Sequence, residues 1–599
     1  MATEDALAPP MQDAVAVPDF PIKPSDRPSS KQQRYDRQLR LWASSGQSAL
    51  ENAHVLVVNG NATATSTLKN LVLPGVGRFT VLDSVAVDES DLGANFFIDP
   101  SSVGKPRAEE VVKFLLELNG DVQGEALVQP LSSLSDLSPY SLILAVDIAS
   151  PSQILSLADA AWKQDIPLVK VETCGFYGTL RTQVRELTIV ETHPESIVDL
   201  RLSHPFPALV EHANSYDYAS MDTEQHGHVP AVIVLIKALE EWKASHGGQV
   251  PNGSAERKAF MDGVMKQKAQ SDEENFDEAV TLYRRAGTKH GIPSDVQPLF
   301  DDPACENVSS SVRSAFFRRS LTSSPLTAIH SQSSNFWILV HALRAFVRHP
   351  SNPSNLLPLP GALPDMKASS SGYVTLQTLY KGKAREDLAL VKQLVGETLD
   401  RVGVERSRIA DEEVETFVKH AAWLKVVRGR SLREEENDCA LKGKIGSILS
   451  AASFQQPPDS SLCIYAALRS ASTFLTLHNR YPGSSLPSAA PTTEVDSSVD
   501  WEADAAELAK IAVKLVEEWS EGEDLASMGI EAEQWKEDLT KVCKEVARAP
   551  PSTTLPQTSA LLGGLVAQEA IKVITKQYIP LNGTCVWDGI RSGTGIVDA

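Results

Sequence analysis

The sequence predicts an α/β protein with a doubly wound, Rossmann-like domain that is discontinuous in the chain and carries a large, mainly helical insertion. Three observations support this. Short apolar runs alternate with amphipathic helical patterns from residue 54 to residue 171, as in a parallel sheet covered by helices. From residue 230 to about residue 548 the pattern is mostly helical. A helix and a strand pattern return after residue 558, which suggests that the end of the chain rejoins the sheet.

The first domain is expected to begin with a helix over residues 31–50, where charged residues alternate with Leu39, Leu41 and Trp42. β-rich runs then alternate with helical patterns, and several strands end at Asn or Asp, as strand-to-helix turns often do. We expect strands at 54–58, 78–82, 141–146 and 167–171, and helices at 105–118 and 151–164.

The insertion contains seven strongly helical segments, separated by a Pro-rich break at 350–364 and a Ser/Pro-rich stretch at 483–498 that is typical of a surface loop. The expected helices are 231–242, 276–286, 335–347, 373–400, 411–425, 463–479 and 503–518. The final helix, 561–574, has a small-residue face, and a strand follows at 582–587. The predicted organisation is a disordered tail (1–28), the sheet domain (29–185), the insertion (186–548) and the second part of the sheet domain (549–599).

Composition narrows the class of protein. A net charge of −21 argues against nucleic acid as the main partner and against anionic membrane surfaces. The most apolar stretch, 229–239, is too short to cross a bilayer, and the amino-terminal residues lack a signal-peptide pattern. The six cysteines are far apart and form no CxxC pair, so we expect neither a metal site nor a disulfide framework. We therefore expect a cytoplasmic and nuclear protein.

The turn after the first strand is where domains of this kind bind phosphate, because glycines let the backbone approach the anion at a helix amino end. Here the turn reads NGNATAT over residues 59–65, and Gly60 is its single glycine where GxGxxG needs three. An ordinary tight strand-to-helix turn explains the segment better. We therefore do not expect this chain to bind ATP or NAD by itself.

Two segments, KQQRYDRQLRLW at 31–42 and LKNLVLPGVG at 68–77, resemble the opening of the ubiquitin-like-protein activating enzymes. Members of that family use ATP to adenylate the carboxyl terminus of a small modifier and pass it to a cysteine, and they pair two related domains of which one is active. Further segments resemble one branch, the regulatory subunits that serve neddylation: NFF at 95–97, SVGKPRA at 102–108, LSHPFP at 202–207, LPDM at 363–366, LLGG at 561–564 and ITKQ at 574–577. The resemblance runs from about residue 31 to the carboxyl terminus.

The sequence departs from the pattern of active family members at their nucleotide-binding residues. These carry D-x-D after the second strand and then N-R-Q-F, whereas here Asp83 is followed by Val85, and GANF at 93–96 lacks the arginine that pairs with phosphate. Lys105 is retained, although a single lysine at a helix start is usually solvated. The transfer cysteine is typically followed by Thr, and none of the six cysteines here is. Cys174 is expected to pack as a small buried residue. We assign no catalytic residue to this chain.

The resemblance implies that Arg37 contributes to catalysis in a partner. In similar enzymes the arginine of the Tyr-Asp-Arg motif in the inactive half reaches ATP held by the active half. A guanidinium suits that role because it is always charged and donates several hydrogen bonds. On the residues alone, Arg34, Arg37 and Arg40 would instead form a solvated helix face.

The resemblance also implies a heterodimer in which the catalytic subunit holds ATP and Mg²⁺, with the modifier bound through the complex. Partner contacts are expected at Pro364, Asp365, Met366, Tyr373 and Leu376, although Met366, Tyr373 and Leu376 could equally belong to the core. The helical insertion is expected to line the groove that holds the modifier.

Two other functions stay open at this point. A self-sufficient adenylyltransferase of the same fold would need the glycine turn, the second Asp and the N-R-Q-F arginine. A non-enzymatic helical scaffold would need none of them. ATP–pyrophosphate exchange with and without a catalytic partner distinguishes the three.

Overall fold

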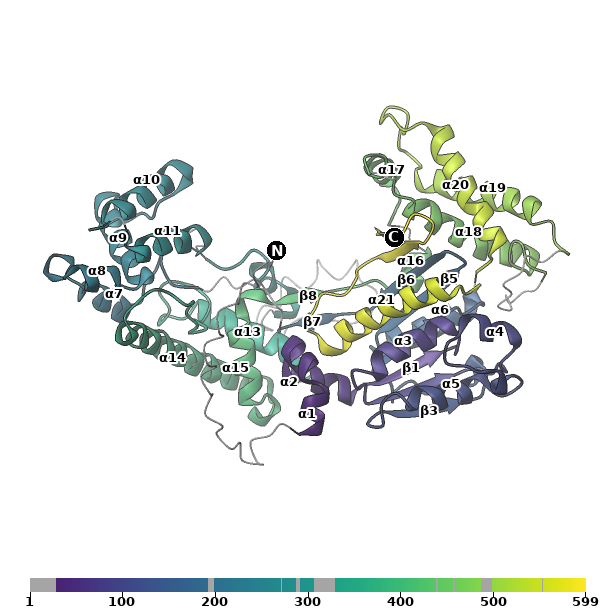
Figure 1. Ribbon diagram of the computed structural model, residues 1–599, viewed down its shortest axis with the longest axis horizontal. Coiled ribbons are helices and arrows are strands. Elements are labelled where there is room, and N and C mark those ends of the chain that lie inside the picture. Colours follow the sequence, from purple (N-terminus) through teal and green to yellow (C-terminus); the bar gives the residue numbers. More distant parts are fainter. Residues whose placement is uncertain are drawn as a thin grey trace, which may run out of the picture.

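The structure is a computed structural model that describes residues 29–191, 199–270, 272–286, 291–305, 329–437, 440–455, 458–485, 498–551 and 553–598. The predicted disordered tail, 1–28, and most of the Ser/Pro-rich stretch at 483–498 lie outside the described residues. Figure 1 shows a sheet domain on one side, a helical arm on the other, and a further group of helices next to the sheet.

An eight-stranded sheet in the order β10-β9-β6-β5-β4-β1-β2-β3 forms the centre of the first domain. Five neighbouring strands are parallel, and β1 lies between β2 and β4, so the strand order reverses beside β1. The strands are β1 (His54–Val58), β2 (Arg78–Leu82), β3 (Gln123–Leu127), β4 (Leu142–Val146), β5 (Leu168–Cys174), β6 (Tyr177–Gln183), β9 (Thr584–Asp588) and β10 (Gly593–Val597).

Alternating side chains of the central strands point into two separate cores. Val55 and Val57 of β1 pack in a core with helices α3 (Ala62–Val72), α5 (Arg107–Leu116) and α21 (Pro556–Thr575). Leu56 and Val58 point to the other face, where α6 (Pro151–Lys163) covers them. Helices on both faces of a mainly parallel sheet confirm the predicted doubly wound fold.

The carboxyl-terminal segment completes this domain, as the sequence predicted. Helix α21 lies directly against α3, and Gly563 permits this approach because a Cβ added there would lie 2.5 Å from Cβ of Ser66. β9 then pairs with β6, and β10 pairs with β9. The sheet domain is therefore discontinuous in the chain. One more of its helices, α4 (Glu89–Ala94), lies near the switch point, the place beside β1 where the strand order reverses.

The first helix is broken where the sequence predicted one continuous helix over 31–50. The structure has α1 (Ser30–Arg34) and α2 (Asp36–Asn52), and α2 itself is kinked at Trp42 and Ala43, where Ala43 has φ 55°. The break at Tyr35 follows from tertiary packing, because this side chain is only 2% exposed.

A helical arm, defined here as α7 to α15, leaves the sheet domain through β7 (Leu187–Ile189) and returns through β8 (Lys425–Val427), which pair antiparallel. The helix predicted over 411–425 is therefore too long: it ends at Lys419, and Lys425 belongs to β8. The arm helices are α7 (Pro207–Asn214), α8 (Thr223–Gly227), α9 (Ala231–Ser245), α10 (Gly253–Lys266), α11 (Glu274–Ala286), α12 (Gln297–Phe300), α13 (Asn335–Val347), α14 (Ser370–Val402) and α15 (Asp411–Lys419).

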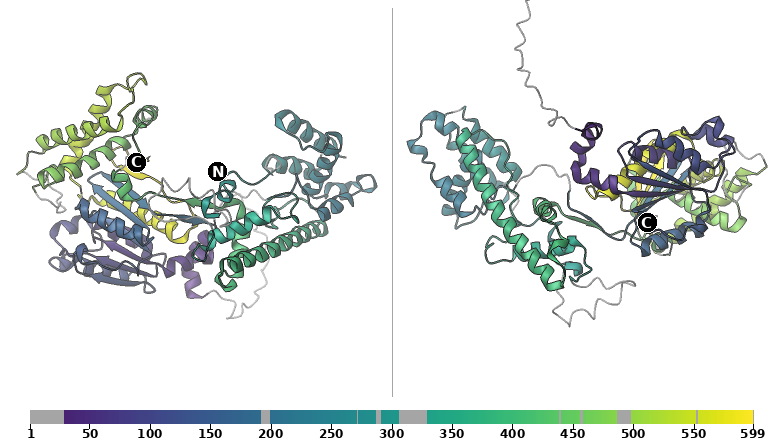
Figure 2. Two further views of the ribbon diagram at one scale, coloured as in Figure 1. Left: turned by 180° about the vertical axis from the view of Figure 1, so that it is seen from behind. Right: turned by 90° about the horizontal axis from the view of Figure 1, so that it is seen from below.

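The rest of the insertion packs on the sheet domain rather than on the arm. Its helix α18 contacts β9 and β10, so this helical cap shares a core with the carboxyl-terminal strands. Figure 2 shows the cap and the arm on different sides of the molecule. The elements are α16 (Leu432–Asn437), α17 (Ile445–Ser453), α18 (Ser461–His478), α19 (Trp501–Trp519) and α20 (Ala532–Arg548). No helix among the described residues is long and apolar enough to span a bilayer.

Candidate functional site

The carboxyl ends of β1, β2 and β4 meet at the switch point, where open α/β sheets bind ligands. β1 leads into a turn at Asn59 and Gly60, and the side chain of Asn61 caps α3 by accepting a hydrogen bond from the amide of Ala64 at 3.1 Å. Asn59 has φ 78° and Asp147, which follows β4, has φ 48°. Both left-handed conformations turn the chain sharply at this edge.

A buried arginine fills this edge. Arg107 is 6% exposed, and its guanidinium donates from Nε to Oδ2 of Asp83 at 2.7 Å and from Nη1 to Oδ1 of Asp91 at 3.1 Å. Its third nitrogen, Nη2, donates to Oδ1 of Asn59 at 2.7 Å. Burial opposes the charge, but the two carboxylates raise the pKa of Arg107 above its usual range. Arg107 was not among the residues predicted from the sequence, where Lys105 was considered instead.

The turn amide that could face a phosphate is already bonded inside the chain. The backbone N–H of Gly60 donates to Oδ2 of Asp83 at 2.8 Å, and the N–H of Val85 donates to Oδ1 at 2.9 Å. A Cβ added at Gly60 would lie 3.2 Å from that Asp83 oxygen. Asp83, the aspartate retained from the active pattern, is therefore hydrogen-bonded to the amide of Gly60, the single glycine of the turn. A phosphate would meet a carboxylate here.

The other predicted positions also have local roles. Asn95, in the GANF segment, is buried, and its Oδ1 accepts from the Thr65 hydroxyl at 2.9 Å and from the Phe97 amide at 3.0 Å. Phe96 is 92% exposed. Lys105 lies on the surface, with Nζ 3.7 Å from Oε1 of Glu110. The structure brings Asp83 to the turn, but not Lys105.

Asp147 is a buried carboxylate that forms no ion pair with any residue that the structure describes. It accepts hydrogen bonds from the Thr173 amide at 2.6 Å, the Thr173 hydroxyl at 2.8 Å and Nδ2 of Asn61 at 2.6 Å. Burial nevertheless raises its pKa from 3.8 to about 6. These bonds join the ends of β4 and β5 to the start of α3.

The described cysteines lie in environments that disfavour a thiolate. Cys174 is buried as predicted, its thiol donates to the carbonyl oxygen of Ala549 at 2.9 Å, and burial raises its pKa well above the usual value. Burial also raises the pKa of Cys305 to about 11 and those of Cys463 and Cys543 to about 12. Cys439 lies outside the described residues.

The arginines at 34, 37 and 40 differ in their surroundings. Arg34 donates from Nη1 to Oδ1 of Asn119 at 2.8 Å and pairs with Asp121 at 3.0 Å. Arg40 pairs with Asp36 of the same helix at 2.9 Å. Arg37 is exposed and has no hydrogen-bond or ion-pair partner within the described part of the chain. Its guanidinium is therefore available to another molecule.

The predicted partner contacts lie at the start of α14 and just before it. Asp365 is exposed, and Pro364, Met366 and Tyr373 are half-buried. Leu376 is fully buried in the arm core, so the structure contradicts its assignment to a docking surface. The reason is the helical repeat: Leu376 and Tyr380, one turn apart, both face the helices that pack against α14.

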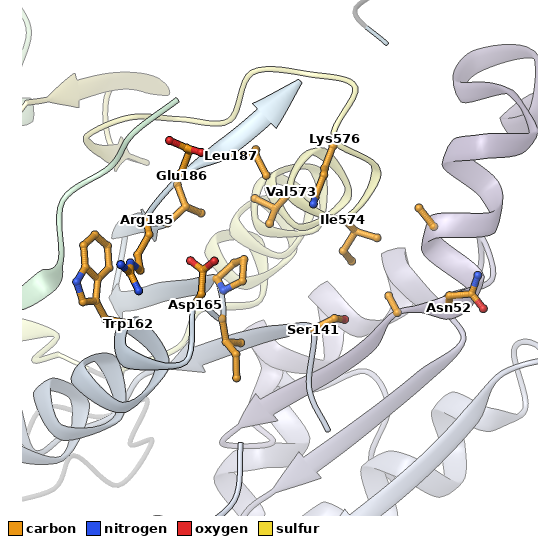
Figure 3. A pocket seen from close by; sticks show the side chains of 15 residues that line it. Asn52, Ser141, Trp162, Asp165, Arg185, Glu186, Leu187, Val573, Ile574 and Lys576 are labelled. Carbon is orange, nitrogen blue, oxygen red and sulfur yellow. The ribbon is translucent and has the colours of Figure 1, made fainter. Parts of the chain in front are cut away.

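A cavity of about 310 Å³ lies at the opposite edge of the sheet, where α2, α6 and α21 end (Figure 3). Its rim includes Asp165, Arg185 and Lys576. Burial raises the pKa of Asp165, while Arg185 and Lys576 oppose this rise. Helix carboxyl ends carry partial negative charge, and the two cations lie where such charge is stabilised by a positive side chain.

The family model described as ThiF family matches residues 35–589. Over 579 residues the chain is 36% identical to the NEDD8-activating enzyme E1 regulatory subunit of Danio rerio, covering 94% of this chain and 98% of that one. The chain belongs to the family of these regulatory subunits. A regulatory subunit of the same family from Drosophila melanogaster is 32% identical over 580 residues, covering 96% of this chain and 98% of that protein.

The family extends to plants, where the NEDD8-activating enzyme E1 regulatory subunit AXR1 of Arabidopsis thaliana is 31% identical over 565 residues and is covered for 94% of its length. The similarity to these NEDD8-activating enzyme regulatory subunits thus includes the sheet domain, the arm and the cap together. It confirms the family that the Tyr-Asp-Arg segment and the later motifs indicated.

Proposed function

We propose that this chain is the non-catalytic regulatory subunit of a heterodimeric NEDD8-activating enzyme. In this complex a catalytic subunit, with its own related domain, binds ATP and Mg²⁺, adenylates the modifier and passes it through a cysteine thioester to a conjugating enzyme. Similarity over nearly the full length of relatives that bear this name supports the proposal.

One observation carries the assignment of a non-catalytic role: Arg107 fills the phosphate-binding edge. To admit a triphosphate, the chain would have to separate Arg107 from Asp83 and Asp91, all of which are buried. Separating a buried pair typically costs about 3–5 kcal/mol, because a desolvated charge is left without compensation. The freed carboxylates would also repel the phosphates. Adenylation is therefore expected in the partner.

Arg37 supplies the proposed contribution of this chain to chemistry. Its exposed guanidinium, which has no partner among the described residues, would reach the ATP held by the catalytic subunit. A fixed cation directed at the phosphates stabilises the charge that develops during transfer. Pro364, Asp365, Met366 and Tyr373 keep exposed surface that could contact the partner.

ATP–pyrophosphate exchange tests the proposal with three samples: this chain, a candidate catalytic subunit, and the reconstituted pair, each with the modifier present. We expect exchange in the pair and none with this chain alone. Exchange by this chain alone would support a self-sufficient adenylyltransferase. A catalytic subunit that exchanges equally well without this chain, and does not bind it, would support an unrelated scaffold.

Three further predictions from the sequence accompany this proposal. The chain is expected in the cytoplasm and nucleus, its acidic charge disfavours nucleic acid and anionic membranes, and the modifier is expected to bind through the complex. Fractionation of cells that express the full chain, with its catalytic partner followed in parallel, checks the location.

A further inference from the structure

We infer that Asn119 and Tyr35 are positioning residues. They hold the segment from Ser30 to Arg40, which carries Arg37, in the orientation that Arg37 needs to reach the partner's nucleotide. This inference rests on the proposed function. It concerns how the sheet domain fixes a short, otherwise exposed helical segment.

Tyr35 anchors the segment at the junction between α1 and α2. It is the one buried residue between Ser30 and Arg40. Its ring lies against the backbone of Gly75, which has φ 91°, and a Cβ added at Gly75 would come within 2.8 Å of the Tyr35 hydroxyl oxygen. Glycine is therefore needed opposite Tyr35. The segment is held two residues before Arg37.

Asn119 connects this anchor to the sheet domain through all four hydrogen bonds available to a side-chain amide. Nδ2 donates to the Tyr35 hydroxyl and to the Val72 carbonyl oxygen, both at 2.9 Å. Oδ1 accepts from Nη1 of Arg34 at 2.8 Å and from the Asp121 amide at 3.2 Å. These partners fix the amide's orientation, because turning it over would set its NH₂ group against the Arg34 guanidinium.

The network leaves Arg37 as the unengaged cation of the segment. Arg34 is bound to Asn119 and Asp121, and Arg40 to Asp36, so both flanking arginines have local acceptors. At the kink itself, Nε2 of Gln577, two residues after the end of α21, donates to the Trp42 carbonyl oxygen at 2.9 Å. The backbone that carries Arg37 is thus held on both sides, while its side chain remains available.

Such positioning lowers the cost of ordering Arg37 when it meets the phosphates. Loss of one positioning hydrogen bond should therefore weaken the contribution of Arg37 without removing the residue. Tyr35→Phe is the milder change, because it deletes a single hydroxyl and keeps the packed ring. Asn119→Ala is the stronger change, since it removes all four bonds.

The test measures the ATP dependence of exchange by the reconstituted heterodimer. Tyr35→Phe is expected to raise KM for ATP roughly threefold and Asn119→Ala roughly tenfold, the scales of one and of two lost hydrogen bonds. Arg40→Ala removes an arginine of the same helix whose partner is Asp36, and is expected to leave KM unchanged. Tm and the stoichiometry of the purified complex show whether each variant folds and assembles. If Asn119→Ala does not assemble, Tyr35→Phe decides the test.

A second comparison separates positioning from a general structural effect. In an Arg37→Ala background, Tyr35→Phe should raise KM no further, because the residue it positions is absent. An equal rise in both backgrounds would overturn the inference, as would no rise in either. If Arg37→Ala itself leaves KM unchanged, the proposed role of Arg37 fails first. A rise in KM with Arg37→Ala, but none with Tyr35→Phe or Asn119→Ala, would refute the positioning role and leave the proposed role of Arg37 intact.

Discussion

Arg107 is the residue on which the interpretation of the switch point depends. It bonds to Asp83, Asp91 and Asn59 at the edge where a nucleotide-binding turn would offer backbone amides to phosphate. A short repeat in the sequence could have identified it, because Arg107, Val111 and Leu115 follow the i, i+4, i+8 spacing of a buried helix face. Lys105 precedes that helix and stays outside the repeat.

Arg107→Ala should strongly destabilise the sheet domain, because it leaves the buried carboxylates of Asp83 and Asp91 without a cation. We expect the free energy of unfolding to fall by about 3–5 kcal/mol. Urea unfolding measures the change. Arg433→Ala is the control, since Arg433 pairs with Asp159 on the surface and should matter little. Equal effects of the two substitutions would show that the Arg107 cluster is not a buried structural unit.

Asp147 should give the stability of the sheet domain an unusual pH dependence. Its pKa is about 6 in the folded chain against an ordinary value of 3.8, so between these values the folded state binds more protons than the unfolded state. The contribution of Asp147 to stability is therefore largest at low pH and declines as pH rises from about 4 to 6, by about 3 kcal/mol at most. Urea unfolding of the wild type and Asp147→Asn across this range checks the difference. A difference in the free energy of unfolding between the two proteins that stays constant across this pH range would contradict the prediction.

At the scale of elements, the sequence predicted the strands and helices with clear apolar periodicity, but it missed the buried strand β6 and the helix α20. α13 begins and ends at the predicted residues, Asn335 and Val347. The edge strand β3, with the sequence QGEAL, was missed because its side chains are largely polar or small. The helix predicted over 411–425 ran too far, since pairing of β8 with β7 depends on a partner about 240 residues away in the chain, which local patterns do not reveal.

The contact between α3 and α21 predicts opposite effects of one substitution at adjacent glycines. Gly563→Ala introduces a Cβ that would lie 2.5 Å from Cβ of Ser66, so we expect a loss of about 1–3 kcal/mol. Gly564→Ala meets no atom within 4 Å and should stabilise the helix slightly. Thermal unfolding of both variants measures the difference. Similar shifts of Tm would argue against close packing of the two helices.

For the whole molecule, the general arrangement was predictable but the division of the insertion was not. The helical arm joins the sheet domain through β7 and β8, whereas the helical cap shares a core with the carboxyl-terminal strands (Figures 1 and 2). The periodicity of a helix tells which face is buried but not which other element covers it. The sequence therefore indicated one insertion, and the packing separates it into two groups.

The attachment of the arm should depend on contacts around Glu186. Its Oε1 accepts from Nε1 of Trp337 at 2.7 Å, and its Oε2 accepts from Nε of Arg428 at 2.8 Å, next to β7 and β8. Glu186→Ala is expected to speed hydrogen exchange of the backbone amides in both strands. Asp400→Ala is the control, because Asp400 pairs with Arg406 inside the arm. Unchanged exchange in both variants would show that Glu186 does not stabilise this attachment.

The stoichiometry of ATP binding tests the central claim most directly. Calorimetric titration with Mg²⁺·ATP would be carried out on this chain alone and on the reconstituted heterodimer. The backbone amide of Gly60 and the guanidinium of Arg107 are already hydrogen-bonded to Asp83. We therefore expect no saturable binding of ATP to the isolated chain and one bound ATP for each heterodimer. One ATP bound by the isolated chain, or two by each heterodimer, would contradict the account.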